Sequence, residues 1–507
     1  MSAIEPAYAL FARKYESGRA SVLVATLVAD LETPVSACLK LARGRRGNMF
    51  LLESVEGGAQ RGRYSMIGLD PDVIFRSTGA HAEINRRAAH DPDGFLPCPG
   101  KPLEVLRTLL EDSRIDLPQG LPPMSAGVFG YLGYDMVRQM ERLPPVKPDP
   151  IGVPEALLIR PTVMVVFDSV RDEMVVVTPI RPLAGVTARA AHEAAQSRLD
   201  AVVAALEAPL NHAPPAVDPA LLADKATSNT TEAEFLAMVA RAREYIVAGD
   251  AFQIVLSQRF SARFDLPAFS LYRALRRVNP SPYLCYLDFG GFQIVVSSPE
   301  ILVRVRDGKV VIRPIAGTRW RGKTAAEDAA LAAELLADPK ERAEHLMLLD
   351  LGRNDVGRVA KIGTVKVTDS FFVERYSHVM HIVSNVEGVL RDDVDVVAAL
   401  AAGFPAGTVS GAPKVRAMEI IDELEKDKRG IYAGCIGYFG AGGEMDTCIV
   451  LRASIVKDGF MHVQAGAGIV YDSEPAYEHR ECVNKAQALF RAAEEAVRFA
   501  TSAKRGQ

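Results

Sequence analysis

The sequence predicts an α+β protein, and three observations support this. Short runs rich in β-branched and aromatic residues occur in both halves of the chain, as in GNMFLLESV (47–55). Helical stretches lie between these runs without the regular βαβ alternation that builds a parallel sheet. The segments VMVVF (163–167) and EMVVV (173–177) flank a polar turn, which is typical of a β-hairpin.

The helices are predicted from apolar periodicity and from signals at their ends. Thr231 and Glu234 have the spacing of a capping box, and Gly249 supplies a C-terminal stop for the helix 231–250. The last helix opens at Ser473-Glu474-Pro475, where proline is favourable in the first helical turn. Three further helices are expected, at 188–208, 338–359 and 411–425.

A stretch rich in Pro, Ala and Asp at 208–230 is interpreted as a linker. It divides the chain into an N-terminal half, 1–207, and a C-terminal half, 231–500. The length allows two to three domains, although large sheets can also fuse into one body.

Composition and charge exclude several classes of protein. The formal net charge of −4, without a basic block, argues against a nucleic-acid partner. No window approaches 18 uncharged apolar residues, so no membrane span is expected. The six cysteines are scattered without CxxC spacing, which argues against zinc or a disulfide framework and favours a reducing cytoplasm. The N-terminus also lacks the apolar segment of a signal peptide.

Glutamates on two predicted helices are candidate cation ligands. Glu478, Glu481 and Lys485 share one face of the last helix, where a solvated ion pair is the simpler interpretation. Glu344 precedes 346–351, a segment apolar enough to predict burial on almost every side. Because Mg²⁺ takes only one or two protein carboxylates, one glutamate from each helix would suit it. Spacing alone leaves both interpretations open.

The pair His378 and His381 resembles a zinc site only superficially. Both lie in an alternating, β-branched run that predicts a strand, and residues three apart on a strand point to opposite faces. Either histidine would therefore act alone, as an acid or a base, although a structural role is more common.

Three glycine clusters, at 317–318, 407–411 and 466–468, could hold anions through backbone N–H groups. None fits the phosphate loop or the dinucleotide fingerprint, so a nucleotide cofactor is not indicated. With Arg452 and Lys414 interleaved, the clusters would suit a small molecule that bears several carboxylates. No G-x-S-x-G elbow is present, so covalent acyl chemistry is not expected.

Nine ordered segments together resemble one enzyme family. They are TPVSACLKL (33–41), FLLESVEGG with GRYSMIG (50–68), SSPE (297–300), PIAGTR (314–319), EHLMLLDLGRND (344–355), FPAGTVSGAPKVRAME (404–419), DTCIVLRA (446–453), QAGAGIVYDS (464–473) and ECVNKA (481–486). The chain is similar to chorismate-utilising enzymes, and among them to the large, synthase subunits of anthranilate synthase. This resemblance implies large antiparallel sheets in a sandwich, with helices packed outside.

The resemblance also implies roles for individual residues. Glu344 and Glu481 match the family's Mg²⁺ ligands. Glu300 matches the general acid that protonates the departing 4-hydroxyl, which requires burial to raise its pKa. His381 matches the histidine of the elimination step. Thr408 is expected beside the ring, Gln253 near the path of ammonia, and chorismate against Gly317, Thr318, Tyr432, Arg452, Gly466, Ala467, Gly468 and Lys485.

Two positions distinguish the reactions found within the family. Relatives that make 4-amino-4-deoxychorismate commonly carry a nucleophilic lysine at the position of Ala316. Isochorismate and salicylate synthases carry a lysine base at the position of Gln253. Both differences indicate anthranilate as the product. The alternatives are an aminodeoxychorismate synthase of folate synthesis and a catalytically silent regulatory or scaffold subunit.

Partners follow from the same resemblance. The chain contains no glutaminase cysteine elbow, so ammonia is expected from a separate glutamine amidotransferase subunit, in a homo- or hetero-oligomer. Feedback inhibition by tryptophan is expected at a pocket formed by Ser54, Pro282, Tyr283 and Leu284.

Overall fold

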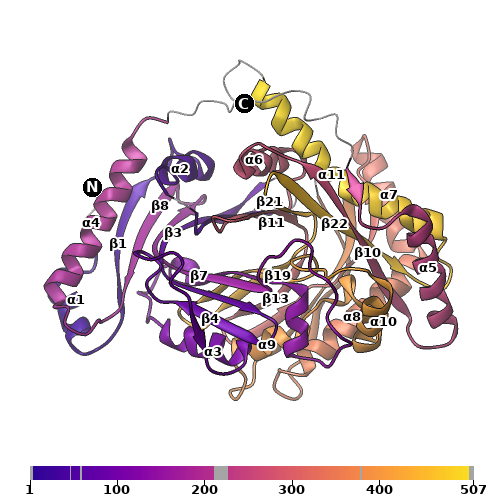
Figure 1. Ribbon diagram of the computed structural model, residues 1–507, viewed down its shortest axis with the longest axis horizontal. Coiled ribbons are helices and arrows are strands. Elements are labelled where there is room, and N and C mark those ends of the chain that lie inside the picture. Colours follow the sequence, from indigo (N-terminus) through magenta and orange to yellow (C-terminus); the bar gives the residue numbers. More distant parts are fainter. Residues whose placement is uncertain (1–3, 46, 57–59, 211–225, 377–378, 502–507) are drawn as a thin grey trace.

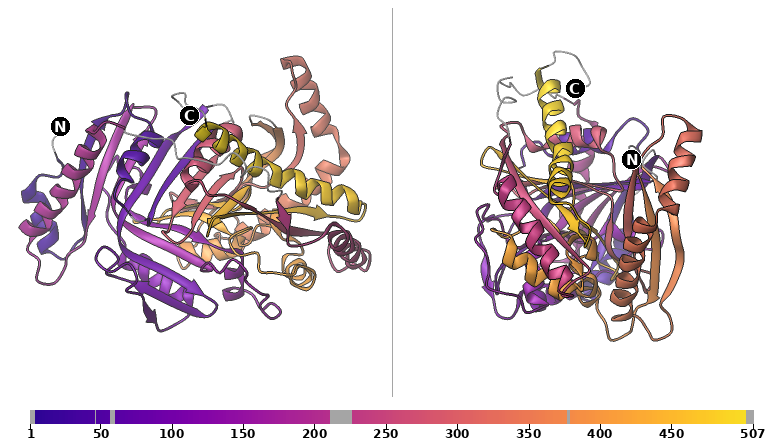
Figure 2. Two further views of the ribbon diagram at one scale, coloured as in Figure 1. Left: turned by 45° about the horizontal axis from the view of Figure 1, so that its top comes forward. Right: turned by 90° about the vertical axis from the view of Figure 1, so that its right-hand side faces the viewer.

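The computed structural model describes residues 4–45, 47–56, 60–210, 226–376 and 379–501 (Figure 1). Antiparallel strands form a branched sheet whose two branches stack face to face, with helices outside (Figures 1 and 2). This arrangement confirms the α+β prediction.

The first branch begins in the N-terminal half and ends in the C-terminal half. Its strands pair in the order β1 (Ser21–Val28), β8 (Glu173–Ile180), β7 (Ala156–Asp168), β3 (Gln60–Thr78), β2 (Met49–Glu56), β11 (Tyr283–Asp288), β12 (Gln293–Ser298), β21 (Ala453–Lys457), β22 (Phe460–Ile469) and β10 (Gln253–Arg263). The short strands β9 (Thr227–Ser228) and β18 (Gly411–Ala412) also pair with β10.

The second branch leaves the first at β7, which pairs with β8 through its C-terminal part and with a different strand through its N-terminal part. From β7 it continues through β6 (Gly127–Leu132), β19 (Cys435–Gly440), β20 (Met445–Ile449), β13 (Ile301–Arg306), β14 (Lys309–Ile312) and β17 (Val379–Val389). Strands β15 (Ile315–Trp320) and β16 (Lys366–Arg375) flank β17, and β4 (His81–Asn85) and β5 (Leu96–Cys98) extend β3.

An apolar core fills the space between the branches, and helices bury the outer faces. Inward-facing side chains such as Phe50, Phe129 and Ile294 are fully buried there, as expected where two sheets pack together. The first branch is covered by α1 (Tyr8–Glu16), α2 (Pro34–Leu41), α4 (Ala188–Glu207), α6 (Ala268–Val278) and α11 (Pro475–Thr501). The second is covered by α3 (Pro102–Asp112), α8 (Pro339–Gly357) and α9 (Val396–Gly403). Helix α10 (Lys414–Leu424) packs against β10 and β18 of the first branch. Helix α5 (Glu232–Val247) packs near β10, and α7 (Ala325–Ala337) packs against β15–β17.

The two halves of the chain share this sheet system rather than forming separate ones. Strand β2 pairs with β11, and β6 pairs with β19, so each branch is continuous across the halves. Of the predicted linker 208–230, residues 211–225 lie outside the described residues.

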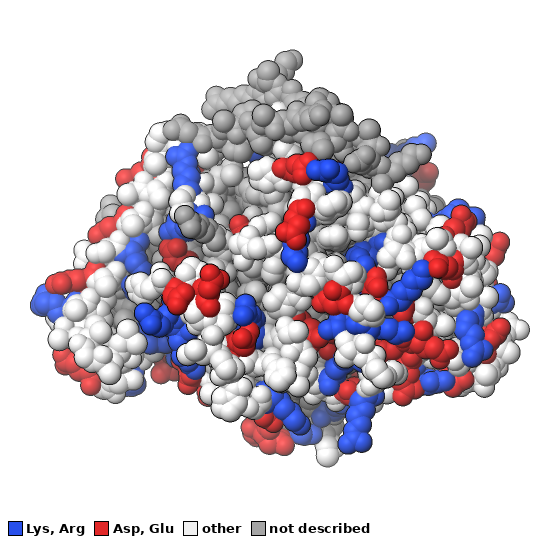
Figure 3. Space-filling view, in the orientation of Figure 1, with Lys and Arg blue, Asp and Glu red and all other residues white. Residues whose placement is uncertain are grey.

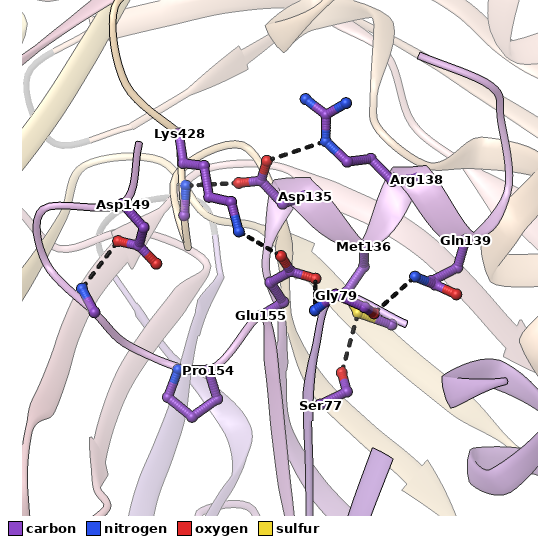
Figure 4. Close-up of polar contacts among 12 residues, drawn as sticks. Ser77, Gly79, Asp135, Met136, Arg138, Gln139, Asp149, Pro154, Glu155 and Lys428 are labelled. Carbon is purple, nitrogen blue, oxygen red and sulfur yellow. Dashed lines mark hydrogen bonds and ion pairs between the residues drawn. The ribbon is translucent and has the colours of Figure 1, made fainter. Parts of the chain in front are cut away.

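Buried charges add a polar contact between the halves (Figure 4). Lys428, in the segment that follows α10, donates to Glu155 at 2.6 Å, and Glu155 also accepts from the backbone N–H of Gly79. Asp135 accepts from the N–H of Gly430 at 3.1 Å. Burial raises the pKa of Asp135 to about 6, against the opposing charge of Lys428.

Most predicted elements are confirmed. The hairpin is β7–β8, the capping box of Thr231 and Glu234 is present, and Pro475 begins α11. One prediction is wrong: α8 is not buried on almost every side of 346–351, because Leu346 is 50% exposed and Asp350 faces solvent.

Charged residues of both signs are mixed on the face seen in Figure 3. Among the helices in the described ranges, none has the length and apolarity that a bilayer span requires.

Candidate active site

The candidate site is assembled mainly from elements of the C-terminal half. Strands β10 and β22 supply Gln253 and the Gly466–Gly468 backbone, and helices α8 and α11 supply the glutamates. Strands β15 and β17 bring Gly317, Thr318 and His381 together. Glu300 precedes β13, and Thr408 lies in the 3₁₀ helix η4 (Gly407–Val409).

Gln253 is the first residue of β10 and is 3% exposed. Its Nε2 donates to Glu344 at 3.2 Å, while its buried Oε1 has no partner among the described residues. Gly468 lies beside this amide, where an added Cβ would collide with Nε2. Glycine at 468 therefore leaves the space that Gln253 needs to reach Glu344. Because Nε2 makes that bond, the Oε1 atom of Gln253 remains available as an acceptor.

The predicted metal ligands come from different helices but influence each other. Burial raises the pKa of Glu344, and the nearby charges of Glu341 and Glu481 add to the rise. Lys485 donates to Glu481 at 2.6 Å and to the carbonyl of Gly466 at 2.9 Å. Thus the ion pair expected on α11 is present, and the same lysine contacts the glycine strand.

Glu478 belongs to this carboxylate group as well. It is 6% exposed, and burial raises its pKa, with a contribution from Glu481. The described residues contain no compact cluster of three or more potential metal ligands among His, Cys, Asp and Glu. However, Mg²⁺ binds through one or two carboxylates together with water and substrate oxygens. The hard oxygen donors of Glu344 and Glu481, in a locally acidic environment, fit that ion.

His381 is held by a bulge in the adjacent strand. Its Nδ1 lies 2.8 Å from the carbonyl of Gly317 and 3.2 Å from the hydroxyl of Thr318. The β15–β17 register shifts between Ala316 and Arg319, and Gly317 has a φ of 68°, which favours glycine. A carbonyl oxygen only accepts, so Nδ1 must carry the proton.

The remaining ring nitrogen of His381, Nε2, is buried and has no partner within the described ranges. Burial lowers the pKa of His381 to about 4, and the nearby positive charge of Arg452 contributes. The histidine is therefore neutral near pH 7, with its Nε2 lone pair available as a base.

Burial shifts the pKa of Glu300 in the direction opposite to that of His381, because the neutral form of a carboxyl group is the protonated one. It is 6% exposed, and burial raises its pKa to about 8. The Thr408 hydroxyl, which donates to Oε1 at 3.2 Å, and the N–H of Ile315 partly oppose this rise. At neutral pH this carboxyl holds a proton, as a general acid must.

Arg452 is a half-buried cation with no acidic partner among the described residues. Burial lowers the pKa of its guanidinium, and no ion pair to it is found in the part of the chain that the structure describes. Its φ of 48° is unusual for a residue with a side chain and marks local strain. A bound carboxylate would compensate this charge.

The other predicted substrate contacts differ in orientation. A Cβ on Gly466 would lie 2.8 Å from the Tyr432 hydroxyl, so this ring faces the glycine strand. The side chain of Ala467 packs in the opposite direction, in the core with Ile254 and Leu256, which leaves only its backbone for binding.

Tyr376 is a site residue that the sequence did not indicate. Its ring centroid lies 5.4 Å from that of His381, and it is 5% exposed. Burial raises the pKa of its hydroxyl, and the charges of Glu374 and Glu300 contribute to the rise. The turn between β16 and β17, where its N–H donates to the Val379 carbonyl, brings it beside His381, and no sequence pattern indicates this contact. His378, the other histidine of this segment, lies outside the described residues.

The predicted inhibitor residues lie elsewhere, where the halves meet. Ser54 on β2 is directly opposite Tyr283 on β11, and Ser54 donates to the Tyr64 carbonyl at 3.2 Å. The Tyr283 hydroxyl donates to Asp446 at 3.0 Å. Leu284 points into the helix-covered core, and Pro282 precedes β11.

Comparison with known proteins identifies the family. The model for chorismate binding enzymes matches residues 51–491. This chain belongs to that family. A curated relative from Cereibacter sphaeroides, anthranilate synthase component 1, is 55% identical over 98% of this chain and 99% of its own. The same component from Pseudomonas putida is 46% identical over 95% and 96%. The crystal structure of anthranilate synthase component I from Streptococcus pneumoniae is 38% identical, with a TM-score of 0.73 over 85% of this chain and 92% of that one.

The tautomer of His381 provides a direct test of the geometry. With ¹⁵N-labelled histidine and His381→Gln for assignment, NMR should show protonated Nδ1 and unprotonated Nε2 at pH 7. Because the pKa is lowered to about 4, the ring should stay neutral until the pH falls through that value. A proton on Nε2, or protonation near pH 6.5, would contradict the assigned hydrogen bond.

Proposed function

We propose that this chain is the synthase component of an anthranilate synthase, which converts chorismate and ammonia into anthranilate and pyruvate, the first committed step of tryptophan biosynthesis. The observation that carries the proposal is the coexistence of a protonated acid, Glu300, and a neutral base, His381, near the cation Arg452, which forms no ion pair with any described residue. The names of relatives 46–55% identical over nearly the whole chain support the same reaction.

In the first step ammonia adds to C2 of chorismate as the 4-hydroxyl leaves. Glu300 gives its proton to that hydroxyl, which departs as water, and the product is 2-amino-2-deoxyisochorismate. The Oε1 of Gln253, which has no partner among the described residues, would accept an N–H of ammonia and so orient the nitrogen lone pair. Arg452 binds a substrate carboxylate with its guanidinium.

In the second step the Nε2 atom of His381 takes the proton from C2. The C3–O bond breaks, the ring becomes aromatic, and the enolpyruvyl group leaves and is protonated to pyruvate. Since Nδ1–H is held by the Gly317 carbonyl, only Nε2 is available for this transfer.

Magnesium belongs to the proposal as well. Glu344 and Glu481 would hold it, and the bound ion would neutralise and orient a substrate carboxylate. Lys485 and the glycine strand would complete the anion site from the protein side.

Ala316 supports anthranilate over aminodeoxychorismate, the main alternative. It is 7% exposed and has no nucleophilic group, so it cannot attack the ring. Under the proposal, ammonia therefore adds directly at C2. A silent subunit is disfavoured, because Glu300, His381 and Arg452 form a connected site with opposed pKa shifts.

A separate glutamine amidotransferase subunit is the proposed source of ammonia, and tryptophan the proposed inhibitor. The register of β2 and β11 supports the inhibitor site, because it brings Ser54 and Tyr283 side by side. The proposed location is the cytoplasm, in agreement with free thiols at the described cysteines.

Product identification tests the proposed reaction first. The purified chain is mixed with chorismate, Mg²⁺ and an ammonium salt at mildly alkaline pH, and products are analysed by fluorescence and mass spectrometry. Mg²⁺-dependent anthranilate and pyruvate are expected. Aminodeoxychorismate would overturn the interpretation of Ala316, and the absence of turnover would favour the silent subunit.

Exchange of Glu481 tests the metal assignment without relying on turnover. Glu481→Gln should weaken Mg²⁺ binding by about a hundredfold, since it removes one charged ligand, and should abolish activity while the fold persists. Calorimetric titration of Mg²⁺ with chorismate present and ammonia omitted measures the affinity. Glu494→Gln, at an exposed position of the same helix, is the matched control, and a normal affinity in Glu481→Gln would refute the assignment.

Enlarging Ser54 tests the inhibitor site. Ser54→Phe should retain catalysis and raise the tryptophan concentration for half-inhibition by about tenfold or more, because the larger ring overfills the space beside Tyr283. Initial rates measured against tryptophan concentration give the shift. Ser17→Phe, at an exposed serine, should behave as wild type, and unchanged inhibition in Ser54→Phe would remove Ser54 from the site.

A further inference from the structure

Arg429 is a buried arginine with an unusually complete set of hydrogen bonds. It is 3% exposed and lies in the segment between α10 and β19. Two of its bonds go to Glu425, from Nε to Oε2 at 2.9 Å and from Nη2 to Oε1 at 2.6 Å. The rings of Tyr134 and Tyr432 lie 4.8 and 5.7 Å from the guanidinium carbon. The residue is thus fixed on every side.

The other two bonds of Arg429 reach the catalytic elements. Nη1 donates to the carbonyl of Val409 at 2.6 Å, and Nη2 donates to the carbonyl of Val255 at 2.6 Å. Val409 directly follows Thr408 in η4, and Val255 lies two residues after Gln253 on β10. The guanidinium of Arg429 therefore joins η4, which carries Thr408, to β10, which carries Gln253.

Glu425 extends the same connection. Its Oε1 accepts from both the N–H and the hydroxyl of Ser257, at 2.8 and 2.9 Å. Ser257 is opposite Gly466 in the β10–β22 pairing. The pair of Arg429 and Glu425 is therefore bonded to the backbone of β10, the strand next to Gly466 on β22.

We propose that Arg429 is a positioning residue that holds η4 so that the Thr408 hydroxyl reaches Glu300. This rests on the proposed function in assigning the acid role to Glu300. The Thr408 bond of 3.2 Å leaves little tolerance, since a shift of η4 by a few tenths of an ångström would break it. A lysine could not replace Arg429, because an ammonium on a flexible stem lacks the planar fork that binds two carbonyls and a carboxylate at once.

The two residues next to Arg429 in the sequence contact the N-terminal half instead. Lys428 and Gly430 bond Glu155 and Asp135, which belong to the N-terminal half (Figure 4). Lys428 and Arg429 are thus adjacent and both engaged in buried ion pairs, but only Arg429 contacts the catalytic elements. This contrast supplies a matched control.

The titration of Glu300 tests the proposal. The charged and polar groups that face this carboxyl are the Thr408 hydroxyl on η4, the N–H of Ile315 on β15 and Tyr376 between β16 and β17. Thr408 stabilises the ionised form, so losing its bond should raise the pKa of Glu300 above about 8. In Arg429→Lys we expect a rise of about one unit and a fall in kcat of about tenfold or more, with a small change in KM.

The measurement is infrared spectroscopy of the protonated carboxyl as a function of pH, with each variant referenced to the same variant carrying Glu300→Gln. Thr408→Val should give the same rise, and the combined variant no further rise. Lys428→Met should lower Tm and leave the Glu300 titration unchanged. Because this readout needs no turnover, a failed product assay would refute the proposed function separately.

Two outcomes would overturn the proposal: a folded Arg429→Lys protein that titrates like wild type, or a rise in Lys428→Met as large as in Arg429→Lys. If Arg429→Lys does not fold, Glu425→Gln takes its place. That variant keeps the shape of the side chain and weakens two of the four bonds, so a smaller rise in the same direction is expected, and its absence would be decisive against the role.

Discussion

The antiparallel pairing of β10 with β22 is the interaction on which the candidate site depends. It sets Gly466 and Gly468 on one face of the sheet and brings Gln253 to the edge of that face. Lys485 is fastened to the same strand through the Gly466 carbonyl, so α11 and its glutamates take their position from it. The strand pair thus determines where the anion site and the proposed ammonia site lie relative to each other.

Desolvation gives this arrangement its chemistry. Burial disfavours charge on any side chain, so it keeps the proton on Glu300 and keeps His381 free of a second proton. The same physical effect therefore produces an acid and a base at one pH, because the neutral forms of the two groups differ. Burial lowers the pKa of the Arg452 guanidinium, and its backbone has an unusual positive φ. The rest of the fold must therefore compensate for the free energy of desolvating this side chain and straining this backbone.

Local features of the fold could be predicted from the sequence, whereas contacts between distant segments mostly could not. The Thr231 cap and the β7–β8 hairpin depend on neighbouring residues, and both were predicted correctly. The exposure of Leu346 was missed because apolar composition does not reveal what covers a helix. Glu300, His381 and the two metal-ligand candidates were selected through family resemblance, and spacing alone left their roles open.

Tyr376 and Arg429 illustrate what such reasoning cannot reach. Tyr376 reaches His381 through the turn between β16 and β17, and Arg429 contacts η4 and β10, of which β10 is far away in the sequence. Neither residue stands in a pattern with a periodicity or a spacing that could be recognised. Their contribution is visible only once the sheet has brought the segments together.

The sheet places Ala316 close to the candidate base. Ala316 is opposite Ile382 in the β15–β17 pairing, one residue from His381 and from the bulge at Gly317. Without an amine here, and with a neutral amide at Gln253 in place of a lysine base, no group at either position would activate water or attack the ring. Under the proposed function, ammonia is the nucleophile. It is uncharged and has a free lone pair, so it needs neither a lysine base to deprotonate it nor a lysine that first attacks the ring. Under the proposed function, two side chains that lack basic groups would thus determine the product.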